Sequence, residues 1–468
     1  MPPIVLDRAT DVPLAVQLAD ALRAAAASGS LRVGDRLPST RVLAADLAVS
    51  RTVTAAAYEQ LLAEGWVQGR RGSGTYVTAA PPVGGAGPVA PARGSDERRV
   101  RPAQWDERAT RTGGVDLRAG TPCVEVLDRA AWRRAWRAAA DAPPDAEPDA
   151  VGVAAFRAAV VEHLLRHRGM PADPGAVLAT SGSTSAIAEL AATLPRGARV
   201  AVEEPGYQRA RWALQAAGLH VLPVPLDGRG LDVAALPAGL AAVYCTPAHQ
   251  YPLGALLPAD RRVALVERAR ADGFLVIEDD YDGELRFDVA PLPLLASLGP
   301  DVVVHLGTVS KILTPTLGAG WIVAAPAVRA ALLRHRERTG QRPSRAGQRV
   351  FAALAAHGDL ARHLRRLRTE LGARRAAVVS ALGADGVPLR GDRAGAHLVV
   401  GLPGAAEEVA VLAAAARRGV LLDGLARHFA GAPTAAGVVL GYAGPARSQL
   451  EPALAGVTAA VREVLGRP

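Results

Sequence analysis

The 468-residue chain is poor in several residue types on which common classes of protein depend. It has two cysteines, Cys123 and Cys245, which are too few for a disulfide framework and lack zinc-ligand spacing. We therefore expect a reducing compartment and no metal site. No run of about 18 residues is both apolar and uncharged, which argues against a membrane span. Residues 1–8 lack the apolar core of a signal peptide, so we expect a cytoplasmic protein.

Lysine is almost absent. Lys311 is the only lysine, and the other 53 of the 54 Lys+Arg residues are arginine. Arginine replaces lysine as a surface charge, but it does not replace an amine that must lose its proton and attack a carbonyl group. Lys311 is therefore either present by chance or marks the one position where the chemistry requires an amine.

The residues that are present divide the chain into three regions. Hydrophobic residues make up 50% of the sequence, which is enough to form sizeable cores. Residues 1–79 predict a compact module. Residues 80–112 are dominated by Pro, Gly, Ala and charge, which predicts a flexible linker. Residues 113–468 alternate apolar, strand-like runs with Ala-rich helical stretches, which predicts an α/β domain.

The N-terminal module has the pattern of three helices followed by a hairpin. Leucines four residues apart form one apolar helix face between residues 14 and 25. Ser39 and Ser50 are typical caps of two short helices that follow. Residues 69–74, GRRGSG, predict the turn of a hairpin. Two short helices joined by three residues and followed by a hairpin predict a winged helix-turn-helix.

Residues 13–77 resemble the GntR-type DNA-binding domain through the run GDRLPSTRVLAADLAVSRTVTAAAYEQLLAEGWVQGRRGSGTYV. The resemblance implies binding to double-stranded operator DNA. Arginine and threonine at a helix N-terminus place donors toward phosphates and base edges, which agrees with that role. The first 80 residues hold eight arginines and seven acidic residues, so the ordered pattern, rather than charge, favours DNA binding over a plain packing domain. The resemblance places these residues at DNA: Arg36, Arg41, Arg51, Thr52, Thr54, Arg70, Arg71 and Gly72.

Five polar segments of the large region each follow an apolar, strand-like run. They are SGSTS, EEPGYQR, TPAHQYPLG, EDDYDGE and GTVSK, in chain order. Ligands of α/β sheets bind outside the carboxyl ends of the strands, where such segments meet. Singly, each segment has an ordinary structural explanation, such as a helix cap, a packed tyrosine, a structural histidine or a solvated acidic loop.

Together and in this order, the five segments resemble the pyridoxal-phosphate site of fold-type I aminotransferases. The resemblance implies pyridoxal 5'-phosphate as cofactor, with Lys311 forming the Schiff base and Asp279 holding the pyridinium proton, which makes the ring an electron sink. The further residues that it assigns are Tyr281 and His249 at the ring hydroxyl, Tyr207 on the ring face, Ser183, Thr184, Thr308 and Ser310 around the phosphate, and Arg209 for an effector's anion.

The whole chain resembles the MocR group of bacterial regulators, in which a winged-helix head is joined to an aminotransferase-like body. The runs HQYPLG and EDDYDGE resemble that group more than ordinary aminotransferases. The expected fold is α/β, with a large mixed or parallel sheet and a smaller C-terminal α+β part from about residue 330. The resemblance also implies a homodimer that binds two DNA half-sites.

Two positions depart from the aminotransferase pattern. Gly318 stands where an arginine normally clamps the cofactor phosphate, and losing such a contact costs about 1.5–3 kcal/mol. Val439 stands where an arginine normally binds the substrate carboxylate, a role that Arg427 or Arg447 would have to take. Thr184 and Ser185 also replace the group's usual glutamine pair. These changes weaken the case for amino-acid transamination.

We therefore expect a transcriptional regulator that binds pyridoxal 5'-phosphate through Lys311. It would sense the cofactor, or an amine or amino acid joined to it, because the ligand prefers one arrangement of the chain. The alternative is an active aminotransferase that carries a DNA-binding head. Without arginine at positions 318 and 439, we expect at most residual transaminase activity. A binding module that has lost the cofactor is a third reading, against which the presence of Lys311, Asp279 and Tyr281 argues.

Overall fold

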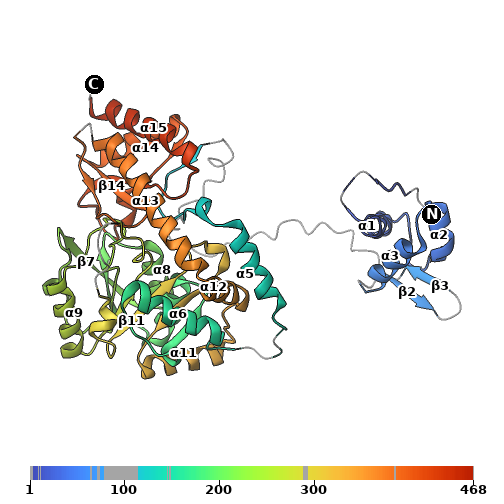
Figure 1. Ribbon diagram of the computed structural model, residues 1–468, viewed down its shortest axis with the longest axis horizontal. Coiled ribbons are helices and arrows are strands. Elements are labelled where there is room, and N and C mark those ends of the chain that lie inside the picture. The colour runs from blue at the N-terminus through green and yellow to red at the C-terminus, as the bar shows by residue number, and fades with distance from the viewer. Residues whose placement is uncertain are drawn as a thin grey trace, which may run out of the picture. The chain divides into compact units, whose positions relative to one another are not determined.

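The computed structural model consists of two compact units, residues 1–102 and 103–468, which are considered separately (Figure 1). Their division falls inside the segment for which the composition predicts a linker, and that segment lies outside the described residues. No helix of the described part is long and apolar enough to cross a membrane. The structure describes residues 4–8, 10, 12–63, 66–70, 74–77, 114–144, 146, 149–287, 293–383 and 386–466.

The N-terminal unit confirms the predicted winged helix-turn-helix. Ser39 and Ser50 precede α2 and α3, and their hydroxyls accept hydrogen bonds from the backbone N–H groups of Val42 and Val53, each at 3.3 Å. The helices enclose a small apolar core, and the strands pair antiparallel in the order β1-β3-β2. The elements are α1 (Leu14–Ala27), β1 (Arg36–Leu37), α2 (Thr40–Asp46), α3 (Arg51–Ala63), β2 (Val67–Arg70) and β3 (Gly74–Val77).

The body is built on an eight-stranded mixed sheet in the order β5-β12-β11-β10-β9-β6-β7-β8, which confirms the expected fold class. The run from β11 to β7 is parallel, whereas β12 and β8 are antiparallel to their neighbours. Strands covered on both faces are made of continuous apolar runs, as here. The strands are β5 (Val177–Thr180), β6 (Arg199–Glu204), β7 (His220–Asp227), β8 (Gly230–Leu231), β9 (Ala242–Cys245), β10 (Leu275–Asp279), β11 (Val303–Thr308) and β12 (Gly320–Val323).

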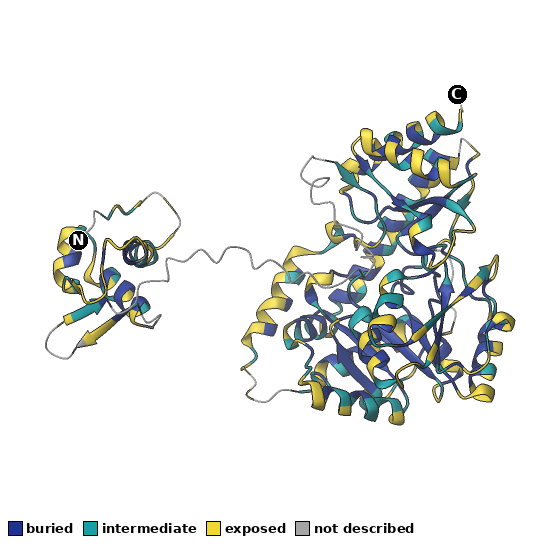
Figure 2. Cartoon of the chain, turned by 180° about the vertical axis from the view of Figure 1, so that it is seen from behind, coloured by how far each residue is buried: buried dark blue, intermediate teal, exposed yellow. Residues whose placement is uncertain are grey.

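Helices cover both faces of this sheet. On β5, Val177 and Ala179 belong to one apolar core, and Leu178 between them belongs to the other, because successive side chains of a strand point to opposite faces. Figure 2 shows the buried residues along the strands and the exposed residues on the outer sides of the helices. The helices of this part are α5 (Arg129–Asp141), α6 (Ala154–Arg168), α7 (Ser183–Thr193), α8 (Gln208–Ala216), α9 (Ala259–Asp272), α10 (Leu295–Leu298), α11 (Pro326–Thr339) and α12 (Arg345–Ala356), with the 3₁₀ helices η1 (Val124–Val126), η2 (Pro174–Ala176), η3 (Val233–Ala235) and η4 (Pro315–Leu317).

The smaller C-terminal part has its own antiparallel sheet in the order β13-β14-β17-β16. The smaller part was expected to begin near residue 330; beyond that point, α11 still buries Leu332 in a core of the large sheet, and Phe351 of α12 packs against Phe156 of α6 and Trp321 of β12. The small sheet begins only after the long helix α13. The elements are α13 (Asp359–Gly383), β13 (Leu389–Arg390), β14 (His397–Leu402), α14 (Ala405–Arg417), β15 (Val420–Leu421), β16 (Asp423–Gly424), η5 (Leu425–His428), β17 (Ala436–Gly441) and α15 (Arg447–Leu465), with β4 (Val115–Asp116) paired to β15.

Candidate cofactor and DNA sites

The five polar segments singled out in the sequence come together at one edge of the large sheet. Four of them follow β6, β9, β10 and β11, which are neighbours in the sheet and run parallel, so their carboxyl ends meet. The fifth is the start of α7, which directly follows β5. The topology therefore builds one site from segments that span residues 181–311 of the sequence.

Asp279 is the group of this site that indicates most clearly which ligand would fit. It lies at the end of β10 and is 2% exposed. Its Oδ2 accepts a hydrogen bond of 2.8 Å from the hydroxyl of Tyr244 on β9, while its Oδ1 is buried without a partner in the described part of the chain. Burial raises the pKa of Asp279 to about 7. A buried carboxylate oxygen without a partner fits a ligand that brings a protonated ring nitrogen.

Lys311 lies in the loop after β11, with its amine donating to the carbonyl oxygen of Gly120 at 2.5 Å. Burial lowers the pKa of the Lys311 amine, an effect that the carboxylates of Asp282 and Asp279 oppose. A lowered pKa favours the neutral amine that attacks a carbonyl group. The backbone at Ile312, the next residue, is fixed by His363, whose Nε2 lies 2.7 Å from the Ile312 carbonyl oxygen.

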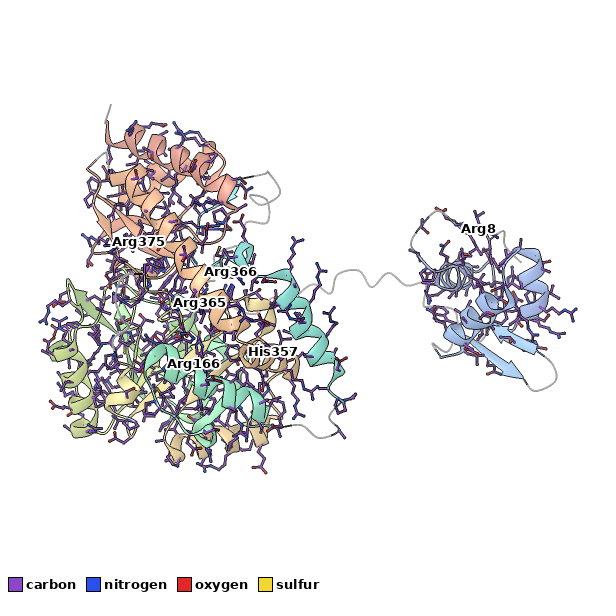
Figure 3. The ribbon with its side chains drawn as sticks, viewed as in Figure 1. Arg8, Arg166, His357, Arg365, Arg366 and Arg375 are labelled. Atoms are coloured by element: carbon purple, nitrogen blue, oxygen red, sulfur yellow. The ribbon has the colours of Figure 1, made fainter. Side chains whose placement is uncertain are left out.

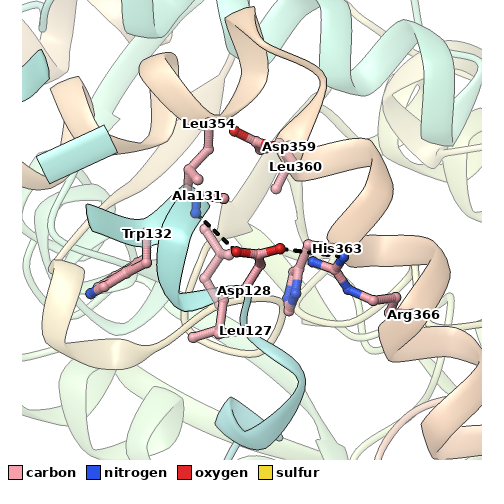
Figure 4. A pocket seen from close by; sticks show the side chains of 10 residues that line it. Leu127, Asp128, Ala131, Trp132, Leu354, Asp359, Leu360, His363 and Arg366 are labelled. Carbon is pink, nitrogen blue, oxygen red and sulfur yellow. Dashed lines mark hydrogen bonds and ion pairs between the residues drawn. The ribbon is translucent and has the colours of Figure 1, made fainter. Parts of the chain in front are cut away.

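The small pocket of Figure 4 is lined by none of the five polar segments. It is formed between the start of α5 and α13, and it shares none of the residues that the sequence assigns to the cofactor. The residues around it are Leu127, Asp128, Ala131, Trp132, Leu313, Leu354, Asp359, Leu360, His363 and Arg366.

Hydroxyl groups gather at the start of α7. A Cβ added at Gly182, the residue before this helix, would lie 3.7 Å from the Thr308 hydroxyl and 4.0 Å from the Ser310 hydroxyl. Thr308 donates to Ser310 at 3.0 Å, and the hydroxyl of Thr184 is 3.1 Å from that of Tyr207. The first N–H groups of an α-helix lack intrahelical partners and attract anions. The residues expected around a phosphate thus offer suitable donors. They include Ser183, the first residue of α7.

The structure brings His249 and Tyr281 together. Their hydrogen bonds, however, are largely to each other and not directed toward a ligand. The Tyr281 hydroxyl donates to the His249 carbonyl oxygen at 2.9 Å and lies 3.2 Å from His249 Nδ1. The same Nδ1 is 2.8 Å from Asp282 Oδ2. The imidazole Nε2 is buried without a hydrogen-bond partner among the described residues. Asp282 therefore orients His249, a role that the sequence did not reveal.

The acidic run after β10 is buried rather than solvated. Asp279, Asp280, Asp282 and Glu284 are each at most 4% exposed. Buried carboxylates require polar partners, and no local sequence pattern identifies them. Arg168, at the end of α6, forms two hydrogen bonds of 2.7 and 2.9 Å to Asp280. The partners are distant in sequence, so only the fold identifies them.

Two positions without the customary arginine have clear structural surroundings. Gly318 follows η4 with a φ of +54°, and no atom of the described residues lies within 4 Å of a Cβ added there. Val439 on β17 is fully buried in an apolar cluster with Val399, Leu425 and Phe429. Of the two substitutes considered, Arg447 is committed elsewhere, since its guanidinium forms an ion pair with Glu370 at 3.1 Å.

On the N-terminal unit, most of the residues expected at DNA are accessible. Arg51 and Thr52 are exposed in the first turn of α3, Arg41 is exposed on α2, and Arg36 is exposed on β1. Arg70 ends β2 and its side chain is not described, while Arg71 and Gly72 lie outside the described residues.

Thr54 is a correction to the DNA-contact set. It is 0% exposed, and its hydroxyl donates to the carbonyl oxygens of Thr40 and Arg51 at 2.9 and 3.0 Å. Its donor is thus used to join α2 to α3, and its burial leaves no surface for a base or phosphate. Thr52 and Thr54 lie on different faces of α3, and only the packed structure shows that Thr52 is exposed and Thr54 is buried.

Comparison with known proteins supports both halves of the chain. Residues 112–424 match the family model of aminotransferase class I and II, and residues 14–77 match that of bacterial regulatory proteins, gntR family. The chain is 35% identical over 460 residues to the HTH-type pyridoxine biosynthesis transcriptional regulator PdxR of Corynebacterium glutamicum, covering 98% of each. It is 34% identical to the probable rhizopine catabolism regulatory protein MocR of Rhizobium meliloti, covering 94% of this chain and 92% of the relative.

The body also resembles solved aminotransferases. Kynurenine aminotransferase of Pyrococcus horikoshii, in complex with PMP, superposes with a TM-score of 0.70 at 25% identity, covering 76% of this chain and 93% of that one. The α-aminoadipate aminotransferase LysN of Thermus thermophilus gives a TM-score of 0.67 at 25% identity, with coverage of 76% and 95%.

Proposed function

Because the chain belongs to the MocR-type subgroup of GntR-family transcriptional regulators, with an aminotransferase class I and II domain as its body, we propose that it binds pyridoxal 5'-phosphate through Lys311. Gene regulation would then respond to the cofactor, or to an amine joined to it. The single observation that carries the cofactor assignment is the buried Oδ1 of Asp279, which has no hydrogen-bond partner among the described residues. A pyridinium N–H is the donor that this oxygen lacks.

Each residue of the site has a distinct task in this proposal. When bound, pyridoxal phosphate supplies an aldehyde that condenses with amines and a ring that accepts electrons. Lys311 provides the amine, whose pKa burial has lowered. Tyr244 holds one oxygen of Asp279 and leaves the other for the ring nitrogen. Tyr207 would hold the ring and the hydroxyls at the start of α7 would hold the phosphate; one of them, Thr184, contacts the Tyr207 hydroxyl.

In this proposal the N-terminal unit binds DNA and the larger unit binds the small molecule. Arg51 and Thr52 are suited to phosphates or base edges, because they are exposed at the start of α3. A ligand changes DNA binding only if its affinity differs between two arrangements of the protein. A cytoplasmic homodimer with two heads would present them to two half-sites of an operator.

The test is the visible absorption of the full-length protein with added pyridoxal phosphate, followed by borohydride reduction and mass spectrometry. We expect a visible band in the wild type and a reduced adduct on Lys311. Lys311→Arg keeps the positive charge but cannot condense with the aldehyde, so it should show neither band nor adduct. A band unchanged in this variant would overturn the assignment. Turnover of amino acids at ordinary aminotransferase rates would instead favour an enzyme.

A further inference from the structure

Asp282 is a buried acid that the cofactor assignment does not include. It follows Tyr281 in the loop after β10, and its side chain is 2% exposed. Its Oδ2 is 2.8 Å from His249 Nδ1, whereas its Oδ1 is buried without a hydrogen-bond partner among the described residues. A buried carboxylate is unfavourable unless hydrogen-bond donors or a positive charge compensate it. The unpartnered oxygen of Asp282 therefore indicates that a positive charge lies nearby.

Lys311 supplies such a charge. Burial lowers the pKa of the Lys311 amine, and Asp282 is the charge that opposes this most, ahead of Asp279. The charge of Arg209 acts in the same direction as burial. An ammonium group has three N–H donors, and in the described part of the chain one of them is used, toward the carbonyl oxygen of Gly120. The amine thus has unused donors in the same site in which Asp282 has an unused acceptor.

Asp279, the other acid of the site, is less suited to balance this amine. One of its oxygens accepts the hydrogen bond of 2.8 Å from Tyr244, and burial raises its pKa to about 7. Near neutral pH it is therefore partly protonated. In the proposed function its other oxygen takes the pyridinium N–H, whose positive charge neutralises the carboxylate. Asp282 is then the acid whose charge remains for Lys311.

The backbone around Gly395 fixes the pair formed by Asp282 and His249. Gly395 has a φ of +71°, and a Cβ added there would lie 2.2 Å from His249 Cε1 and 2.7 Å from Asp282 Oδ2. Only glycine allows this approach. The Gly395 N–H donates to the carbonyl oxygen of Leu285 at 2.8 Å. The pair is thus enclosed between the loop after β10 and the segment that leads into β14.

The other titratable neighbours of this pair do not cancel its charge. The ring of His397 on β14 has its centroid 4.9 Å from that of His249, and burial lowers the pKa of His397 well below its usual value, so this ring is neutral. The Tyr281 hydroxyl is neutral too, because burial raises its pKa well above its usual value. Asp392 forms an ion pair of 2.8 Å with Arg286. Of these neighbours only Arg286 is positive, and Asp392 balances it.

We propose that Asp282, oriented by His249, is the counter-charge of the Lys311 amine and sets how readily this amine captures the aldehyde of the cofactor. Condensation forms a C=N bond from a neutral amine and an aldehyde and releases the aldehyde oxygen as water, so the amine must first give its proton to solvent. The charge of Asp282 favours the protonated amine and restrains this step. Asp282 is a positioning residue, since it acts through Lys311. The inference deepens the proposed function and rests on it, because the charge of the amine matters for capture only if Lys311 takes up the cofactor.

The single lysine makes the test direct. Cofactor-free, full-length protein that carries lysine labelled with ¹³C at the ε-carbon gives one lysine signal, because Lys311 is the only lysine. The chemical shift of this signal follows the protonation of the amine as the pH is changed. Asp282→Asn keeps the size of the side chain and an acceptor for His249 but removes the charge, so the titration midpoint should fall by about one to two pH units. Asp282→Glu keeps the charge, and its midpoint should stay closer to that of the wild type.

Glu203→Gln is the matched control. Glu203 is also a buried acid, with a pKa raised to about 7, but its charge does not act on the Lys311 amine. The control should therefore leave the midpoint unchanged. A midpoint in Asp282→Asn equal to that of the wild type would overturn the proposal. An equal fall in Asp282→Asn and in Glu203→Gln would overturn it too, since the effect would then not be specific to Asp282.

The rate at which the visible band appears after mixing with pyridoxal phosphate tests the consequence for capture. At constant pH, Asp282→Asn should react faster than the wild type, by up to about tenfold for each pH unit by which its midpoint falls. Glu203→Gln should react like the wild type. A lowered midpoint without a faster reaction would show that this charge does not control capture. A wild type without any Lys311-dependent band would instead remove the proposed function, while the labelled-lysine comparison still decides whether Asp282 is the counter-charge.

Discussion

At the scale of single residues, this chain concentrates its chemistry in side chains that are removed from water. Asp279 and Glu203 each have a pKa raised to about 7 by burial. Only Glu203 has its hydrogen-bonding needs largely met, through the N–H and hydroxyl of Thr246 at 3.1 and 2.6 Å. The difference separates Glu203, which is bonded to the Thr246 loop, from Asp279, whose Oδ1 has no partner among the described residues.

The raised pKa of Asp279 predicts a pH-dependent stability of the cofactor-free protein. The folded state holds a proton on Asp279 that the unfolded state releases near pH 3.8, so the free energy of unfolding falls as the pH rises from 3.8 to about 7. Asp279→Asn cannot ionise and escapes this loss. The variant should therefore gain stability over the wild type across this window, by at most about 4 kcal/mol.

Urea unfolding at pH 4 and pH 8 checks this expectation. The stability difference between Asp279→Asn and the wild type should be small at pH 4 and favour the variant at pH 8. Glu203 is present in both proteins and its pKa is raised mainly by burial, so most of its contribution cancels; the smaller part that the charge of Asp279 adds is lost in the variant. A difference that stays constant with pH would mean that Asp279 titrates alike in the folded and unfolded states.

At the scale of elements, the acidic run after β10 depends on α6. Arg168 at the end of α6 is 3% exposed and binds Asp280 through two nitrogens and the Gly283 carbonyl oxygen at 3.1 Å. The neighbouring pair of His163 and Glu284, 2.7 Å apart, is equally buried. The helix thus neutralises the loop that presents Asp279 and Tyr281 to the site.

Removing Arg168 should be costly for this reason. Arg168→Ala leaves the carboxylate of Asp280 buried and unpaired, and we expect it to destabilise the protein by about 3–5 kcal/mol. The matched control is Arg166→Ala on the same helix. Arg166, labelled in Figure 3, forms an exposed ion pair with Glu162 at 2.5 Å, and its loss should cost at most about 1 kcal/mol. Denaturant midpoints measure both; similar values for the two would refute the role of the buried pair.

At the scale of the whole molecule, the chain consists of two units with separate cores, residues 1–102 and 103–468. A ligand stabilises only the unit that it binds, by RT ln(1 + [L]/Kd). Pyridoxal phosphate should therefore raise the melting temperature of the body and leave that of the head unchanged.

Differential scanning calorimetry of the full chain tests this independence. We expect two transitions, of which only the larger moves when the cofactor is added at about 100 times its Kd, where the stabilisation is about 2.7 kcal/mol. Lys311→Arg should reduce the movement. A head transition that shifts by the same amount as that of the body would show that the two units unfold together.

Much of this picture follows from local sequence. The capping serines, the leucine spacing of the first helix and the continuous apolar strands are local signals, and each led to the element that the structure contains. Lys311, Asp279 and Tyr207 could be selected because each directly follows a strand-like run, and the ends of parallel strands must meet. Local patterns did not separate Thr52 from Thr54, because burial depends on which helix face meets α2.

What the amino-acid sequence determines by itself, then, is the set of elements, their order and the identity of the lone amine, since these depend on neighbours along the chain. The partners of the buried groups were decided only by the tertiary structure. Tyr244 reaches Asp279 because β9 and β10 are adjacent, and Arg168 reaches Asp280 across more than a hundred residues of chain. Likewise, Val399 on β14 and Val439 on β17 face each other in the small sheet and share one apolar cluster, a pairing that no local pattern encodes.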